Sequence, residues 1–189
     1  MEPRQIINAA IATLTLFVFG LTLHLTWDSY EQYRAAEQVV RANAMADHLI
    51  QAAGSTALER GLTAAALGAK QPLEPDMRAA IDTARRNSDA AWQAALQAAQ
   101  ALVAANDIPA SFSTTIETTQ SAHQRLQALR ERADSCLDKP DACGIDGMEW
   151  VSVVSAFIDA AGRLREEIFL VIESPREVTQ FNLTMKRWA

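Results

Sequence analysis

Residues 56–67 read TALERGLTAAAL and lie near the end of what the sequence predicts to be one long helix. A stripe of mostly small residues recurs on this helix in alternating steps of three and four, which is typical of helices that pack against other helices. The stripe comprises Val39, Ala42, Ala46, Leu49, Ala53 and Thr56. Its next position is Arg60, and Thr63 and Leu67 continue it. The pattern therefore predicts an arginine on the buried face of a helical bundle.

A buried arginine needs an anionic partner, because the guanidinium group keeps its proton and its burial is otherwise costly. Glu59 is adjacent in sequence, but neighbouring residues on a helix point in different directions. The positions three and four residues away carry no acidic side chain. Two explanations stay open: another helix supplies a carboxylate, or a bound ligand supplies the negative charge.

The run 58–63, LERGLT, follows a long Ala-rich helix and resembles the Glu-Arg-Gly-x-Ser/Thr signature of nitrate- and nitrite-sensing (NIT) domains. Similar helical sensor modules occur in bacterial chemoreceptors, sensor kinases and cyclic-dinucleotide enzymes. The resemblance implies a four-helix bundle in which an arginine of the first helix, here Arg60, helps to hold a small oxyanion.

Composition limits the class of protein. The 189 residues fit one domain plus an anchor, and abundant Ala with only 7 Gly and 6 Pro favours helices. A net charge of −6 without a basic stripe argues against nucleic acid as a partner.

Residues 6–27, IINAAIATLTLFVFGLTLHLTW, form an apolar segment of membrane-spanning length without Asp, Glu, Lys or Arg. Arg4 precedes the segment, while Asp28 and Glu31 follow it, so the N-terminus is expected on the cytoplasmic side. We therefore predict a single-pass protein of a bacterial inner membrane with most of the chain in the periplasm. The expected divisions are 1–27 (N-terminus and transmembrane anchor), 28–174 (sensor bundle) and 175–189 (a short amphipathic segment).

The rest of the chain predicts three further helices, so the expected fold is all-α, an antiparallel four-helix bundle whose first helix continues the anchor. The second helix should begin near Pro75, the third near Ser111 and the fourth near Met148. The third helix has His123 on its inward stripe, where a satisfied core histidine is expected. Its charged outer face is expected to carry Arg125, Arg130, Glu131 and Arg132.

Arg165 lies at the margin of the inward stripe of the fourth helix, and it is the second cationic candidate for a bundle-facing site. A salt bridge of Arg165 with Glu59 or another carboxylate is the alternative. Arg60, Arg165 and Glu59 are the predicted ligand-binding residues.

Cys136 and Cys143 bracket a short polar loop. Outside the cytoplasm such a pair favours a disulfide, whereas free thiols are expected if the topology is different. The two cysteines are an incomplete zinc site, and neither a metal nor a cofactor is expected.

These features indicate an extracytoplasmic sensor domain that binds a small ligand between helices, with an oxyanion such as nitrate or nitrite as one possibility. It would pass a helix shift to a signalling partner or a downstream domain, as a homodimer or with a membrane partner. The alternative is a ligand-free scaffolding bundle for protein–protein contacts at the membrane. An enzyme is not expected, since the sequence has no Gly-rich phosphate loop, nucleophile elbow or metal-ligand spacing.

Overall fold

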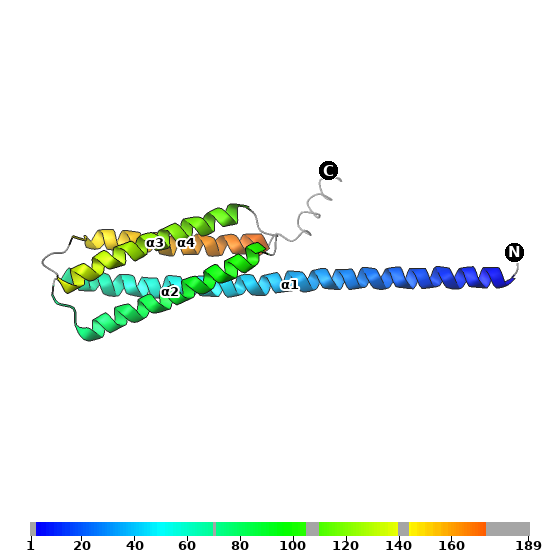
Figure 1. Cartoon of the computed structure of the whole chain (residues 1–189), viewed down its shortest axis with the longest axis horizontal. Helices are drawn as coiled ribbons and strands as arrows, with labels where there is room; N and C mark the ends of the chain where they lie inside the picture. The colour runs from blue at the N-terminus through cyan, green and yellow to red at the C-terminus, as the bar shows by residue number, and fades with distance from the viewer. Residues whose placement is uncertain (1–2, 70, 105–109, 140–143, 173–189) are drawn as a thin grey trace, which may run out of the picture. The chain divides into compact units, whose positions relative to one another are not determined.

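The computed structural model describes residues 3–69, 71–104, 110–139 and 144–172, and within these ranges it is built from four α-helices. Figure 1 shows them in chain order: α1 (Pro3–Ala69), α2 (Pro75–Ala104), α3 (Ala110–Asp138) and α4 (Gly147–Ile172). The predicted all-α fold with a long first helix is confirmed. The predicted amphipathic segment 175–189 lies outside the described residues.

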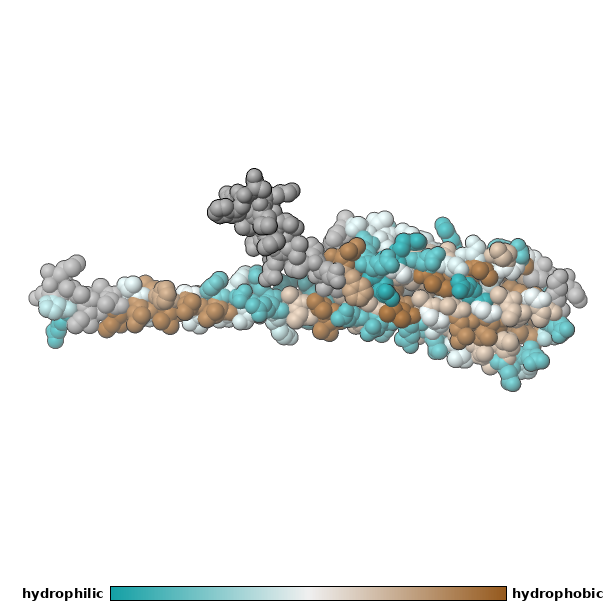
Figure 2. Space-filling model, turned by 180° about the vertical axis from the view of Figure 1, so that it is seen from behind, coloured by the Kyte–Doolittle hydropathy of each residue, from teal (hydrophilic) through white to brown (hydrophobic). Residues whose placement is uncertain are grey.

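The chain divides into two units, Met1–Val40 and Arg41–Ala189. In the first unit, every α1 side chain from Ile11 to Trp27 is exposed, and Figure 2 shows apolar residues along much of this stretch. Among the described residues, α1 is the one helix that is long and apolar enough to be a candidate membrane span.

In the second unit, the part of α1 from Arg41 onward forms a four-helix bundle with α2, α3 and α4. Consecutive helices run in opposite directions (Figure 1), as expected because the connections between them are short. The backbones of α3 and α4 approach each other most closely.

Two helix starts show why the sequence folds this way locally. Pro75 occupies the first position of α2, where its missing N–H has no intrahelical acceptor, and the Glu74 carbonyl accepts from the Arg78 amide. Before α4, the Asp146 carboxylate accepts from the Met148 amide at 3.2 Å and the Asp146 carbonyl accepts from the Trp150 amide. Asp146 is therefore the N-cap of α4.

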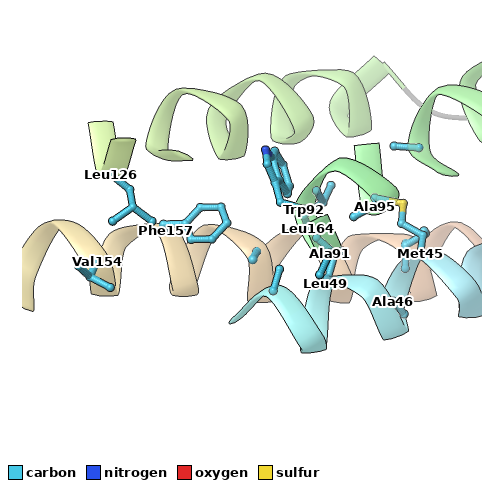
Figure 3. Close-up of a cluster of buried hydrophobic side chains, with 14 of the residues drawn as sticks. Met45, Ala46, Leu49, Ala91, Trp92, Ala95, Leu126, Val154, Phe157 and Leu164 are labelled. Atoms are coloured by element: carbon cyan, nitrogen blue, oxygen red, sulfur yellow. The ribbon is translucent and has the colours of Figure 1, made fainter. Parts of the chain in front are cut away.

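The core lies between the inward faces of α2, α3 and α4 and the bundle part of α1. Figure 3 shows part of it, where Trp92 of α2 and Phe157 of α4 lie among Leu49, Leu126 and Leu164. The rings of Trp92 and Phe157 meet edge to face with centroids 5.6 Å apart. Small residues fill much of the remaining core: Ala42, Ala46, Ala52, Ala84, Ala91, Ala95, Ala99, Ala133, Ala160 and Ala161.

Candidate functional site

The charged residue that α1 buries in the bundle is Glu59, whose exposed fraction is 0%. The sequence predicted the next residue, Arg60, at this place, and that prediction was wrong by one position. Between Leu49 and Thr63, two sets of positions have a spacing that alternates between three and four residues. One set contains Ala52 and Glu59, and the structure buries both. The other contains Ala53 and Arg60, which lie on the flank of α1 and are partly exposed.

Two arginines from other helices bind the Glu59 carboxylate. Arg130 of α3 makes a two-pronged contact, Nε to Oε1 at 2.9 Å and Nη2 to Oε2 at 2.6 Å. Arg85 of α2 donates from Nε to Oε1 at 2.8 Å. A buried carboxylate requires such charge-assisted hydrogen bonds, because burial removes its hydration.

Each of these arginines also binds an aspartate of the opposite helix. Arg85 Nη1 lies 2.8 Å and 2.9 Å from the two carboxylate oxygens of Asp134 in α3, and Arg130 Nη1 lies 2.7 Å from Asp89 Oδ1 in α2. Both helices therefore carry Arg-x-x-x-Asp, 85–89 and 130–134, and the two antiparallel motifs pair reciprocally. Together with Glu59 the two motifs contribute three carboxylates and two guanidinium groups, and Arg78 of α2 lies 3.5 Å from Asp134 at the edge of this cluster.

The sequence placed Arg130 on the charged outer face of the third helix, and the structure contradicts this, since only 4% of its surface is exposed. Arg130 is four residues after Leu126 and seven after His123, so helical spacing puts it on the inward stripe. The sequence prediction placed Arg130 on the surface because of its charge. The repeated Arg-x-x-x-Asp spacing in the second and third helices could have indicated its burial.

Hydrogen bonds and the nearby cation control the acidity of Asp89. Its partial burial alone would raise its pKa, but hydrogen bonds from His123, Arg130 and Gln127 and the charge of Arg130 lower the pKa to about 2. Burial lowers the pKa of the Arg130 guanidinium, but the hydrogen bonds and negative charges of Glu59 and Asp89 reverse this and raise the pKa overall. Asp89 and Arg130 are therefore both charged near neutral pH.

His123 is buried on its predicted stripe. Its Nε2 lies 3.2 Å from Asp89 Oδ1, and its ring lies 5.6 Å from that of Trp92 and 5.2 Å from that of Phe157. It thus joins the charged cluster to the aromatic part of the core, as a satisfied core histidine.

Arg60 lies on the flank of α1 that faces α4. Its Nη1 donates to Ser155 Oγ at 2.8 Å, and its backbone carbonyl accepts from Trp150 Nε1 at 3.1 Å. Within the described residues, no carboxylate pairs with Arg60. Another helix therefore supplies a hydroxyl where the sequence allowed for a carboxylate.

Arg165 is partly buried on α4, and its Nε is buried without a hydrogen-bond partner among the described residues. It lies ten residues beyond Ser155, about 15 Å along the helix axis. The structure therefore does not bring Arg165 next to Arg60, and Glu59 is bound by the arginines of α2 and α3 instead. Ligand contacts of all three residues stay predictions.

Cys136 is buried near the end of α3, while Cys143 lies outside the described residues. The disulfide therefore stays a prediction. In the part of the chain that the structure describes, no three His, Cys, Asp or Glu side chains are grouped to hold a metal ion.

The bundle therefore contains a charged cluster in its interior and an arginine, Arg60, between α1 and α4. A family model described as nitrate and nitrite sensing matches residues 51–170, well over half of the sequence. The chain therefore belongs to the nitrate- and nitrite-sensing family, whose domains are sensory rather than catalytic. No curated protein matches the chain, and no solved structure matches it.

Replacing Arg130 with Met should destabilise the protein by about 3–5 kcal/mol, because it removes two of the three hydrogen bonds to the buried Glu59 and the Arg130 contact of Asp89. The matched control is Arg132→Met on the same helix. The Arg132 side chain is 52% exposed and pairs with Glu149, so its loss should change the stability far less. Urea unfolding of both variants measures the difference, and equal losses would contradict the cluster's structural role.

The lowered pKa of Asp89 predicts a pH dependence. Its ordinary value is 3.8 and its folded value about 2, so its contribution is complete above the ordinary value and is lost as the pH falls toward 2. The stability difference between the parent protein and Asp89→Asn should therefore shrink between about pH 4 and pH 2. Unfolding curves at several pH values measure it, and a constant difference across this window would show that the prediction is wrong.

Proposed function

We propose that this protein is a membrane-anchored sensory input domain that binds a small oxyanion, such as nitrate or nitrite, beside Arg60 between α1 and α4. Its family membership supports the sensory role. The oxyanion and the position of its site rest on Arg60.

The observation that carries the proposal is the state of this arginine. Arg60 is the arginine of the family-like signature, it is partly buried, and its contact is with the neutral hydroxyl of Ser155. A guanidinium group in this setting has hydrogen-bond donors and a positive charge that no described carboxylate balances. A planar oxyanion matches both, since guanidinium binds such groups through paired N–H donors.

Arg165 is the second cationic position that we assign to this function. It lies farther along α4 with its Nε buried, so it would act at the other end of the helix pair rather than on the same atoms as Arg60. Glu59 would act differently, since its carboxylate repels an anion. Its proposed contribution is to fix α1 and thereby the direction in which Arg60 projects.

The signal would be a small displacement of α1 relative to α4. An anion held by Arg60 would draw on contacts from both helices, and packed helices respond by shifts between discrete positions. Because α1 also contains the candidate membrane span, the displacement would pass along one continuous helix to a homodimer mate, a membrane partner or a downstream domain.

One observation favours a scaffolding function as a second candidate. Ile50 and Leu58 lie about two turns apart on α1 and are 50% and 58% exposed. Such side chains suit a protein partner. Self-association without any response to anions would support this candidate over the sensor.

Arg60→Met tests the sensor directly. The variant should be as stable as the parent protein within about 1 kcal/mol, because no salt bridge is broken. It should also lose any rise in melting temperature that nitrate or nitrite gives to the parent, relative to chloride at the same ionic strength. A saturating ligand at a hundredfold excess over its Kd stabilises by about 2.7 kcal/mol, which thermal unfolding resolves readily.

The control for this experiment is Arg163→Met, an exposed arginine of α4, which should keep the full response to the anion. A parent protein that responds to nitrate and nitrite no more than to chloride would remove the oxyanion proposal. Loss of the response in both variants would move the site away from Arg60.

We also propose that residues 6–27 span the bacterial inner membrane once and leave the bundle in the periplasm, where a Cys136–Cys143 disulfide is stable. A reporter enzyme that is active only after export, fused after Ala189, should therefore be active. Deletion of residues 6–27 should abolish that activity. Activity of a cytoplasmic reporter at the same position would overturn this topology.

A further inference from the structure

The contacts around Glu59 have the form of a receptor for a carboxylate. All three hydrogen bonds to its oxygens come from guanidinium groups of α2 and α3, at 2.6–2.9 Å, while α1 provides only the acceptor. The paired Nε and Nη2 donors of Arg130 are the arrangement by which arginine recognises planar oxyanions in general.

The two arginines are positioned without help from α1. Asp134 holds Arg85 through both carboxylate oxygens, and Asp89 holds Arg130. These four groups lie on α2 and α3, and Arg78 of α2 adds a further contact to Asp134 at 3.5 Å. Glu59 thus enters an oriented pair of donors whose positions do not depend on it.

Two polar atoms beside this arrangement are left without partners among the described residues. Arg85 Nη2 is buried and makes no hydrogen bond. The hydroxyl of Thr63, a residue with an exposed fraction of 0%, is equally unpaired and lies one turn beyond Glu59 on the same face of α1. Buried polar groups are usually hydrogen-bonded, so the unpaired Nη2 of Arg85 is a donor for which Glu59 supplies no acceptor.

We propose that Arg85 and Arg130 form an oxyanion-binding site between α2 and α3, which Glu59 occupies as a tethered internal ligand. Small planar oxyanions such as formate or acetate bind there when the Glu59 side chain is absent or withdrawn. The site is distinct from the proposed site at Arg60 and does not depend on it. It makes the attachment of α1 to α2 and α3 exchangeable, so a free oxyanion favours a state in which α1 has moved away.

Glu59→Ala in the full-length protein tests the proposal by chemical rescue. The variant should be less stable than the parent, and formate should raise its melting temperature by about 5–10 °C at a hundredfold excess over its Kd, relative to chloride at equal ionic strength. The parent should show no such shift, because its own carboxylate fills the site. Glu59→Gln should show none either, because its amide fills the same space.

Two double variants locate the effect. Glu59→Ala with Arg130→Met should lose the response to formate, whereas Glu59→Ala with Arg60→Met should keep it. A response that survives the loss of Arg130 or disappears with Arg60 would overturn the proposal, as would equal effects of formate and chloride on Glu59→Ala. If this variant does not fold in buffer, it is refolded from urea into formate, acetate or chloride and followed by circular dichroism. Recovery of helix in formate or acetate alone supports the site, and equal failure in all three salts contradicts it.

Discussion

An ionised carboxylate buried inside a helical bundle loses its hydration, and the surrounding protein has to replace what water supplied. Glu59 imposes this constraint on the whole domain. It requires Arg130 and Arg85 at fixed positions, and they in turn require Asp89 and Asp134. One residue of α1 thereby determines how two other helices face it. Buried ion pairs contribute little net stability compared with apolar packing, so we attribute to this cluster the selection of one arrangement among several that the Ala-rich faces would tolerate.

The two adjacent residues of the signature have separate tasks. Glu59 points into the bundle and joins α1 to α2 and α3, whereas Arg60 lies on the flank and contacts α4 through Ser155. A rotation of α1 that alters one set of contacts necessarily alters the other. This is a direct physical route from a proposed ligand at Arg60 to the packing of the hairpin formed by α2 and α3. Gly61 has open space where a side chain would begin, and nothing in the packing of this chain explains it.

The sequence predicted the four helices, their order and most of their buried faces, because apolar residues at helical spacing leave few alternatives. It predicted the site less well for two physical reasons. Along α1, alanines flank the inward stripe on both sides, so Ala52 with Glu59 and Ala53 with Arg60 fit the spacing equally. On α3, Arg130 fits the inward spacing, but its charge suggested the surface. Its burial is tolerated because Glu59 and Asp89 pair with it, and the spacing alone does not reveal these partners. Reading Arg85–Asp89 together with Arg130–Asp134 as complementary motifs would have identified the pair. Neither the contact of Arg60 with Ser155 nor the spare donor of Arg85 could be predicted from one sequence, because both depend on how the helices are set against one another.

The reciprocal motifs of α2 and α3 also restrict how the domain can move. Arg85 faces Asp134 and Asp89 faces Arg130, so sliding one helix past the other by a single turn would set arginine against arginine or aspartate against aspartate. Like charges at this distance and partly removed from water repel strongly. The hairpin of α2 and α3 is thus locked against ratcheting, whereas α1 contributes only a single carboxylate to the cluster and escapes this restriction. A piston-like stroke of α1, if it carries the proposed signal, would therefore run against a stationary pair of helices.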